Sequence, residues 1–99
     1  MCLVSIIDKK GVITEVNPKF LEVAKYDESE LIVQPHNIVR HPDIPAKVFK
    51  LIWATIDKGD PLRGKVKNRA KDESTYWLDA LINPIIGSDG KPQGYIGFR

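Results

Sequence analysis

Cysteine is nearly absent from this sequence, which has a single one, Cys2, in 99 residues. One thiol cannot form a disulfide within the chain, and it cannot supply a cysteine-based zinc site. Covalent attachment of haem requires a C-x-x-C-H motif, which is also missing. The composition therefore fits a reduced, cytoplasmic setting and indicates no metal site.

A strong charge of one sign and a long apolar run are missing as well. The 15 Lys and Arg residues against 13 Asp and Glu residues give a formal net charge of only +2, which does not indicate nucleic-acid binding. No apolar stretch approaches membrane-spanning length and no signal peptide is present, so we expect no direct membrane insertion by this segment. A Ser-His-Asp arrangement, a phosphate-binding loop and a carboxylate pair are also absent, so we expect no enzyme.

The length and the hydrophobic content of 42% suit one globular domain that buries a real core. The sequence begins and ends abruptly in strand-like residues. We therefore expect residues 1–99 to form a single domain that belongs to something larger.

Proline is concentrated in one segment, Pro35–Pro45, which also contains both histidines of the chain, His36 and His41. Each proline removes a backbone donor and fixes φ, so the segment is predicted to be a structured loop. Loops held on a rigid scaffold commonly carry binding residues. The alternative is a connector whose polar groups satisfy one another.

Helical patterns occupy the middle of the chain. Asn17 and Pro18 are favoured residues for a helix start, and Ser29–Val33 reads as another short helix or a turn. The longest helix is predicted over Pro45–Lys58, where apolar residues recur at helical spacing. Its proposed inward stripe is Val48, Leu51, Ile52, Thr55 and Ile56. Phe49 and Trp53 lie on an adjoining stripe that favours a core role over a ligand contact.

Strand-like runs bounded by turn residues fall at both ends of the chain. The first pair, Cys2–Ile7 and Val12–Val16, reads as a hairpin. The later runs are Leu62–Lys71, Thr75–Ile86 and Gln93–Arg99. Hairpins at both ends with helices between them indicate an α+β domain, with an antiparallel sheet covered on one face and a pocket beneath the helices.

Successive side chains of a strand point to opposite sides, which assigns faces to two of these runs. In Leu62–Lys71 the basic residues form a solvated face, and Asn68 falls on the inner side, where its amide needs backbone, water or ligand as a partner. In Thr75–Ile86 the face assigned to the core is Tyr76, Leu78, Ala80 and Ile82. The opposite face, of mixed character typical of a docking surface, is Trp77, Asp79, Leu81 and Asn83. The alternative is that the two faces are reversed and Trp77 belongs to the core.

Several of these stretches resemble one family of sensor domains. They are the Asn17 hairpin, the segment Pro35–Pro45, Trp53 within IWATIDKGDP, Val66–Arg69 and Tyr76–Ala80. The sequence resembles PAS domains over nearly its whole length. Within that family it is similar to the PAS domain of bacterial aerotaxis receptors and related chemotaxis transducers.

The resemblance implies a five-stranded PAS fold, with short helices and one longer helix covering one face, that binds FAD non-covalently. It implies a module that senses redox state or oxygen and signals to an adjacent domain of the same receptor. The implied cofactor-binding positions are Asn17, Arg40, His41, Asp43 and Asn68, with Trp53 lining the pocket. The family usually has tryptophan directly after the Gly-Asp/Glu-Pro turn, and this chain has Leu62 there.

Two alternatives remain open. One is a PAS domain without cofactor that acts as a protein-interaction or dimerisation module, and the other is a sensor that binds haem through His36 or His41. A photosensor that bonds a flavin to a cysteine is disfavoured, because Cys2 lies at the N-terminus. We expect a cytoplasmic domain, a homodimer as one state of association, and a full-length protein whose membrane anchor, where it has one, lies elsewhere.

Overall fold

The structure is a computed structural model that describes residues 2–39 and 46–98. Its strands are β1 (Val4–Asp8), β2 (Ile13–Val16), β3 (Leu62–Arg69), β4 (Thr75–Ile86) and β5 (Pro92–Phe98). Its helices are α1 (Pro18–Ala24), α2 (Glu28–Leu31), the 3₁₀ helix η1 (His36–Val39) and α3 (Ala46–Ile56). The predicted α+β architecture is confirmed.

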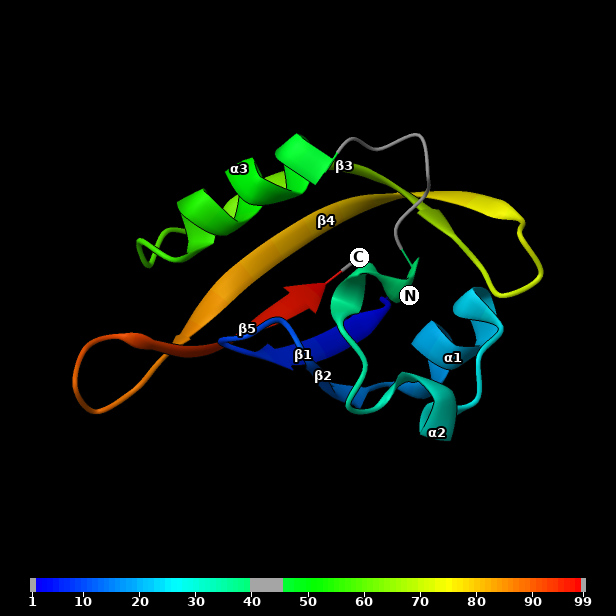
Figure 1. Cartoon of the computed structure of the whole chain (residues 1–99), viewed down its shortest axis with the longest axis horizontal. Coiled ribbons are helices and arrows are strands. Elements are labelled where there is room, and N and C mark those ends of the chain that lie inside the picture. Colours follow the sequence, from blue (N-terminus) through cyan, green and yellow to red (C-terminus); the bar gives the residue numbers. More distant parts are fainter. Residues whose placement is uncertain (1, 40–45, 99) are drawn as a thin grey trace.

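The five strands form one antiparallel sheet in the order β2-β1-β5-β4-β3, drawn in Figure 1. The chain makes the β1–β2 hairpin first, then the helices, and then β3, β4 and β5. The last strand returns to the centre and pairs with both β1 and β4. This placement of β5 joins the two ends of the chain into a single sheet.

Local sequence explains the first helix. The Asn17 side chain accepts a hydrogen bond from the Phe20 N–H at 3.0 Å, and Pro18 occupies the first helical position, as predicted. The helix ends because Lys25 adopts a left-handed conformation with φ of 63°, and its N–H donates to the Leu21 carbonyl. The short α1 therefore turns back at once and leads into α2.

Two expectations for the middle of the chain need correction. The proline-rich segment was expected to contain no regular element, yet His36–Val39 form η1, a single short turn of the kind that needs few hydrogen bonds. Leu51 was assigned to the inward stripe of the long helix, but its side chain is 67% exposed. Between Lys50 and Ile56, where side-chain burial is described, Ile56 is therefore the fully buried apolar residue of α3, and Leu51 faces solvent.

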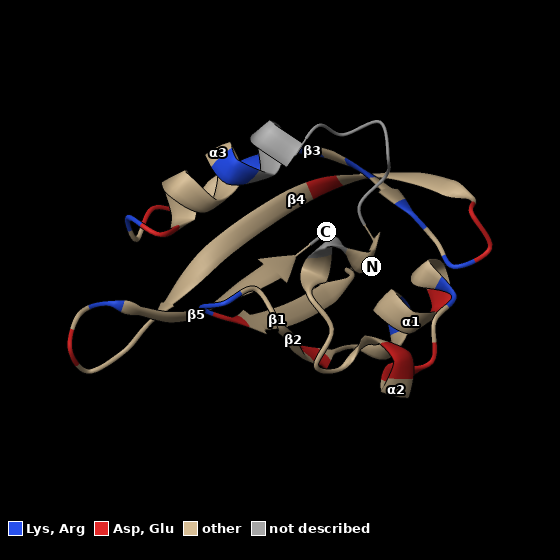
Figure 2. Cartoon of the chain, in the orientation of Figure 1, with Lys and Arg blue, Asp and Glu red and all other residues tan. Residues whose placement is uncertain are grey.

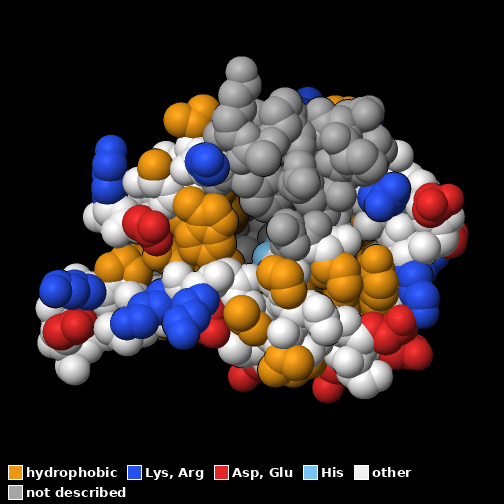
Figure 3. Space-filling view, viewed as in Figure 1, with side chains coloured by type: hydrophobic (Ala, Val, Ile, Leu, Met, Phe, Trp, Pro, Cys, Tyr) orange, Lys and Arg blue, Asp and Glu red, His pale blue; other side chains and the backbone are white. Residues whose placement is uncertain are grey.

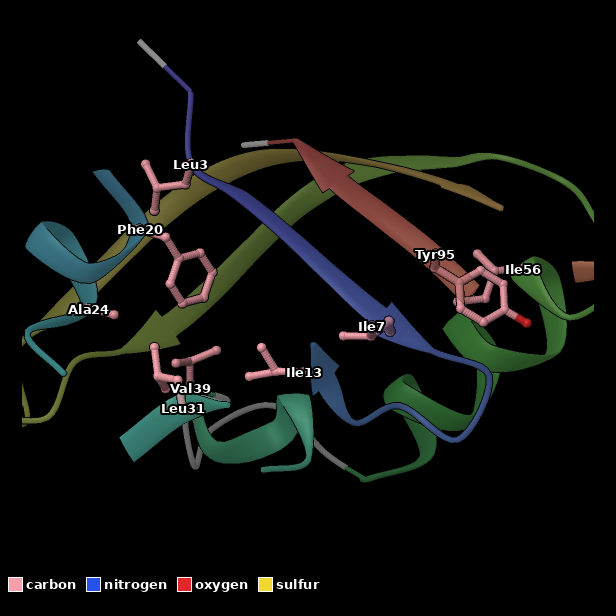
Figure 4. Packing of buried hydrophobic residues seen from close by; sticks show 9 residues of the cluster. All are labelled: Leu3, Ile7, Ile13, Phe20, Ala24, Leu31, Val39, Ile56 and Tyr95. Carbon is pink, nitrogen blue, oxygen red and sulfur yellow. The ribbon is translucent and has the colours of Figure 1, made fainter. Parts of the chain in front are cut away.

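Buried side chains between the sheet and the helices form one core, which extends along the sheet in two groups. The larger group lies against α1, α2 and η1 and consists of Ile13, Phe20, Ala24, Leu31 and Val39. The second, Ile56 and Tyr95, lies where α3 ends, and Ile7 of β1 stands between the groups in Figure 4. All helices that contribute to this core thus cover the same face of the sheet. None of the described helices is long and apolar enough to cross a membrane.

Charged side chains tie the turn between β3 and β4 to the first two helices, and Figure 2 marks the charged residues along these segments. The Lys71 N–H donates to the Ala24 carbonyl at 2.9 Å, and the Lys71 ammonium pairs with Glu30. Beside it, Lys25 Nζ lies 2.6 Å from Asp72 Oδ2. The Lys25 ammonium, aided by Ser74, holds the pKa of Asp72 well below its usual value of 3.8.

This lowered pKa predicts an acid-dependent loss of stability. The folded state binds a proton at Asp72 less readily than the unfolded state, so the stabilisation is complete above about pH 4 and is lost as the pH falls through the folded pKa. We expect Asp72→Asn to lower the melting temperature at pH 7 and to flatten its decline below pH 4. Thermal unfolding between pH 7 and pH 2 measures this, with the exposed Asp60→Asn as control. Parallel curves for Asp72→Asn and the parent chain would contradict the role of this ion pair.

Candidate functional site

The inner face of the sheet, on the side of the helices, is the candidate site. Register places Asn68 opposite Tyr76, Val66 opposite Leu78, Gly64 opposite Ala80 and Leu62 opposite Ile82. Asn68 and Ala80 are buried, whereas Trp77 and Asp79 on the alternate positions are exposed. The predicted parity of both strands is therefore confirmed, and the inner face between the two core groups is mostly apolar with few polar groups.

Asn68 is the polar group that distinguishes this face. Its side chain is only 7% exposed, and it makes no hydrogen bond to the described residues. The amide atoms are not fully buried, so their free donor and acceptor can still be completed by a group that occupies the space over this face. The amide both donates and accepts, which suits the edge of a heterocyclic ring. The residues present thus fit a bound aromatic cofactor.

A second polar contact lies on the β1 side of the same face. Ser5 is 2% exposed, and its hydroxyl lies 3.1 Å from Nε2 of His36 on η1. The His36 ring also meets Phe20 edge to face, with ring centroids 6.2 Å apart. In Figure 3 a small part of a histidine side chain is visible at the surface, close to apolar side chains. These contacts hold the imidazole in place on the inner face.

The far end of the inner face is closed by the C-terminal part of α3. Trp53 packs edge to face on Tyr95, with centroids 5.4 Å apart. On its other side Trp53 covers Gly11, where a β-carbon would lie 2.7 Å from the indole. The Tyr95 hydroxyl donates to Asp57 Oδ1 at 2.5 Å, just beyond the end of α3. These contacts connect α3 to the β1–β2 turn and to β5.

Three of the residues expected at the site lie in the described structure. Asn68 and Trp53 have the positions given above, and Asn17 lies between β2 and α1, beside the start of β1. The Asn17 amide accepts from the Val4 N–H and donates to the Cys2 carbonyl, in addition to capping α1. This set of bonds gives Asn17 a structural function, and its part in cofactor binding stays a prediction. The remaining three expected residues lie outside the described residues: Arg40, His41 and Asp43.

Sequence reasoning missed three residues of this face. Ser5 is a lone hydroxyl in an apolar strand, which is a usable signal for a buried polar contact. Tyr95 stands between Gly94 and Ile96 in β5 and gives no such signal, because its partner Asp57 is 38 positions away. Gly64 shares the inner side of its strand with Asn68, and sequence reasoning assigned it no role. Across the described ranges, no cluster of His, Cys, Asp or Glu could hold a metal ion.

Comparison with known proteins gives consistent matches. A family model described as PAS fold matches residues 13–99. The aerotaxis receptor of Escherichia coli strain K12 is 43% identical over 97 residues, which cover 98% of this chain and 19% of the receptor. The nitrogen fixation regulatory protein of Klebsiella pneumoniae is 26% identical over 96 residues, covering 97% of this chain and 19% of that protein. The chain therefore spans about a fifth of the length of these relatives.

A solved structure agrees on the fold. The crystal structure of the PAS domain of a protein from Colwellia psychrerythraea superposes with a TM-score of 0.86. The two chains are 22% identical, and the match covers 98% of this chain and 82% of the other.

The bond between Tyr95 and Asp57 yields a prediction for the attachment of α3. Burial, followed by the Asp57 carboxylate, raises the pKa of Tyr95 to about 12 from 10.0. The stabilisation it provides is present below pH 10 and lost as the pH rises towards 12. In a double-mutant cycle of Tyr95→Phe and Asp57→Ala we expect a coupling of about 1 kcal/mol at pH 7, measured by denaturant unfolding.

The pH dependence provides the internal check. The difference in unfolding free energy between the parent chain and Tyr95→Phe should shrink between pH 10 and pH 12. Tyr26→Phe, which removes the hydroxyl of another tyrosine, serves as the control. Additive effects of the two substitutions at pH 7 would show that the hydrogen bond does not hold α3.

Proposed function

This chain belongs to the PAS fold family, and from that premise we propose that it is a sensor domain that binds FAD non-covalently and responds to redox state or oxygen. The observation that carries the proposal is the buried Asn68 amide, which has no hydrogen-bond partner among the described residues of an otherwise apolar inner face. The relation to an aerotaxis receptor supports the same reading. The proposed binding residues are those of the resemblance: Asn17, Arg40, His41, Asp43, Trp53 and Asn68.

The residues have separable tasks in this proposal. Arg40 and His41 supply cationic donors for a diphosphate, which arginine contacts in a planar, two-pronged geometry. Asn68 meets the polar edge of the ring, and Trp53 closes the apolar end of the site. The flavin, when bound, supplies a reversible redox change that alters the protonation of its ring. Asn68 can follow such a change, because its amide exchanges donor and acceptor roles by rotating.

The outer face of the sheet is the proposed route of the signal. Trp77 is 64% exposed and Leu81 is 36% exposed on β4, and Lys67 of β3 lies over the Trp77 ring at 5.6 Å. Asp79 stands between them, opposite Lys65. We propose that this surface docks on an adjacent domain of the same protein, since the chain covers only 19% of its receptor relative. The domain then acts in the cytoplasm as part of a signalling protein and is not itself an enzyme.

A second candidate function is a cofactor-free PAS module for dimerisation or other protein contacts. The same exposed pair, Trp77 and Leu81, favours it, because large apolar side chains on a sheet face commonly mark interaction sites. Leu62, in place of the family's tryptophan, also fits this reading. An absorption spectrum of the protein purified from cells separates the candidates, since flavin, haem and no chromophore give different spectra.

Asn68→Leu tests the proposed flavin site. Leucine has a similar volume and removes an amide that lacks partners, so the apo-protein should be as stable as the parent or more so. Loss of the amide should weaken FAD binding about tenfold, the equivalent of one hydrogen bond of about 1.4 kcal/mol. Titration of apo-protein with FAD measures the affinity, and Asn83→Leu on the outer side of β4 is the matched control. Undiminished affinity in Asn68→Leu would remove Asn68 from the site, and Arg40→Ala with full flavin content would remove Arg40.

Docking through the outer face predicts a separation of binding from output. Asp79→Ala and Trp77→Ala should leave flavin content and melting temperature unchanged, because both side chains are exposed. Both should alter signalling in the full-length protein. Leu51→Ala, at another exposed apolar residue, is the control and should leave the output as it was. Loss of flavin in parallel with output, or no effect on either, would contradict the docking role.

A further inference from the structure

Gly64 lies on the inner face of β3, directly opposite the buried Ala80. Apolar pairs flank it on both sides: Leu62 with Ile82, and Val66 with Leu78. Gly64 is nevertheless exposed, and apart from its two chain neighbours no heavy atom of the described residues lies within 4 Å of a β-carbon built on it. The inner face therefore has bare backbone with open space above it at this position.

Nothing in the part of the chain that the structure describes accounts for a glycine here. Its φ is not in the left-handed range, so the backbone conformation is open to any residue. Gly94 of β5 is different, because a β-carbon there would lie 2.6 Å from the Ile7 carbonyl oxygen and packing demands a glycine. A glycine inside a strand is also unfavourable, since it loses more conformational entropy on folding and has no side chain to pack. Gly64 thus costs stability without serving any visible packing contact.

We propose that Gly64 is a contact for the flat ring of the bound cofactor and limits the size of what the site admits. Strand glycines often mark places where a ligand approaches the backbone closely. The Gly64–Ala80 pair offers such an approach, and the flanking pairs supply apolar walls for the face of an aromatic ring. Asn68 lies four residues further along β3, about 13 Å at the rise of a strand, so the amide can reach the polar edge of a ring that lies along β3. The identity of this ring as a flavin rests on the proposed function.

Graded substitution of Gly64 tests the proposal. Gly64→Ala and Gly64→Val add one and three carbons into open space, so the apo-protein should melt at the same temperature as the parent or higher. The dissociation constant for FAD should rise several-fold for Gly64→Ala and at least tenfold for Gly64→Val. Riboflavin, which has the ring but no diphosphate, should lose affinity by the same factors, because the obstruction meets the ring. Lys65→Val, the next residue on the exposed side of β3, is the control and should bind both ligands as the parent does.

The outcomes distinguish a failure of the inference about Gly64 from a failure of the proposed flavin-binding function. Unchanged FAD affinity in Gly64→Val overturns the inference and leaves the proposed function standing. Loss of FAD binding with undiminished riboflavin binding also overturns it, because the ring is then elsewhere. Weaker binding that accompanies a lower apo melting temperature shows that Gly64 is structural. A parent chain that binds no flavin refutes the proposed function and, with it, a flavin ring on Gly64.

Discussion

The register between β3 and β4 is the constraint on which both surfaces of the domain depend. β4 runs for twelve residues, and each inward side chain is followed by an outward one. Asn68 therefore faces Tyr76 on the inside while Lys67 faces Trp77 on the outside. A slip of one residue would bury Trp77 and Asp79, so the buried face itself enforces the pairing. The candidate binding face and the candidate docking face are consequently two sides of one backbone.

The helices show how differently the two ends of the inner face are supported. Around Phe20 and Leu31, fully buried apolar side chains from several short elements close one end. At the other end α3 relies on directional contacts of aromatic rings, with Trp53 on Tyr95 and the Tyr95 hydroxyl on Asp57. The first end is held by non-directional burial and tolerates small shifts. The second depends on angles and on one hydrogen bond, so small displacements there change its energy.

Local and periodic signals made most of the fold predictable. The start of α1 at Asn17, the inward position of Asn68 and the two faces of β4 all follow from patterns of two to four residues. Leu51 was misplaced because helical periodicity gives the direction of a stripe but not the width of the surface that covers it. The Tyr95–Asp57 and Ser5–His36 contacts join residues 38 and 31 positions apart, and no pattern in the sequence links such distant side chains. The position of the candidate site stays a prediction from sequence, and its supporting contacts became visible only in the fold.

The position of β3 at an edge of the sheet has a consequence for self-association. An open edge presents unpaired backbone groups on which another strand can add, and this is a common route to aggregation. The outward side chains of β3 are Arg63, Lys65, Lys67 and Arg69, so a second copy adding there in antiparallel fashion would bring two basic rows together. The opposite edge, β2, is only four residues long. Uncontrolled growth of the sheet is thereby disfavoured at both ends, and the chain can leave Trp77 and Leu81 uncovered on its face without inviting strand addition beside them.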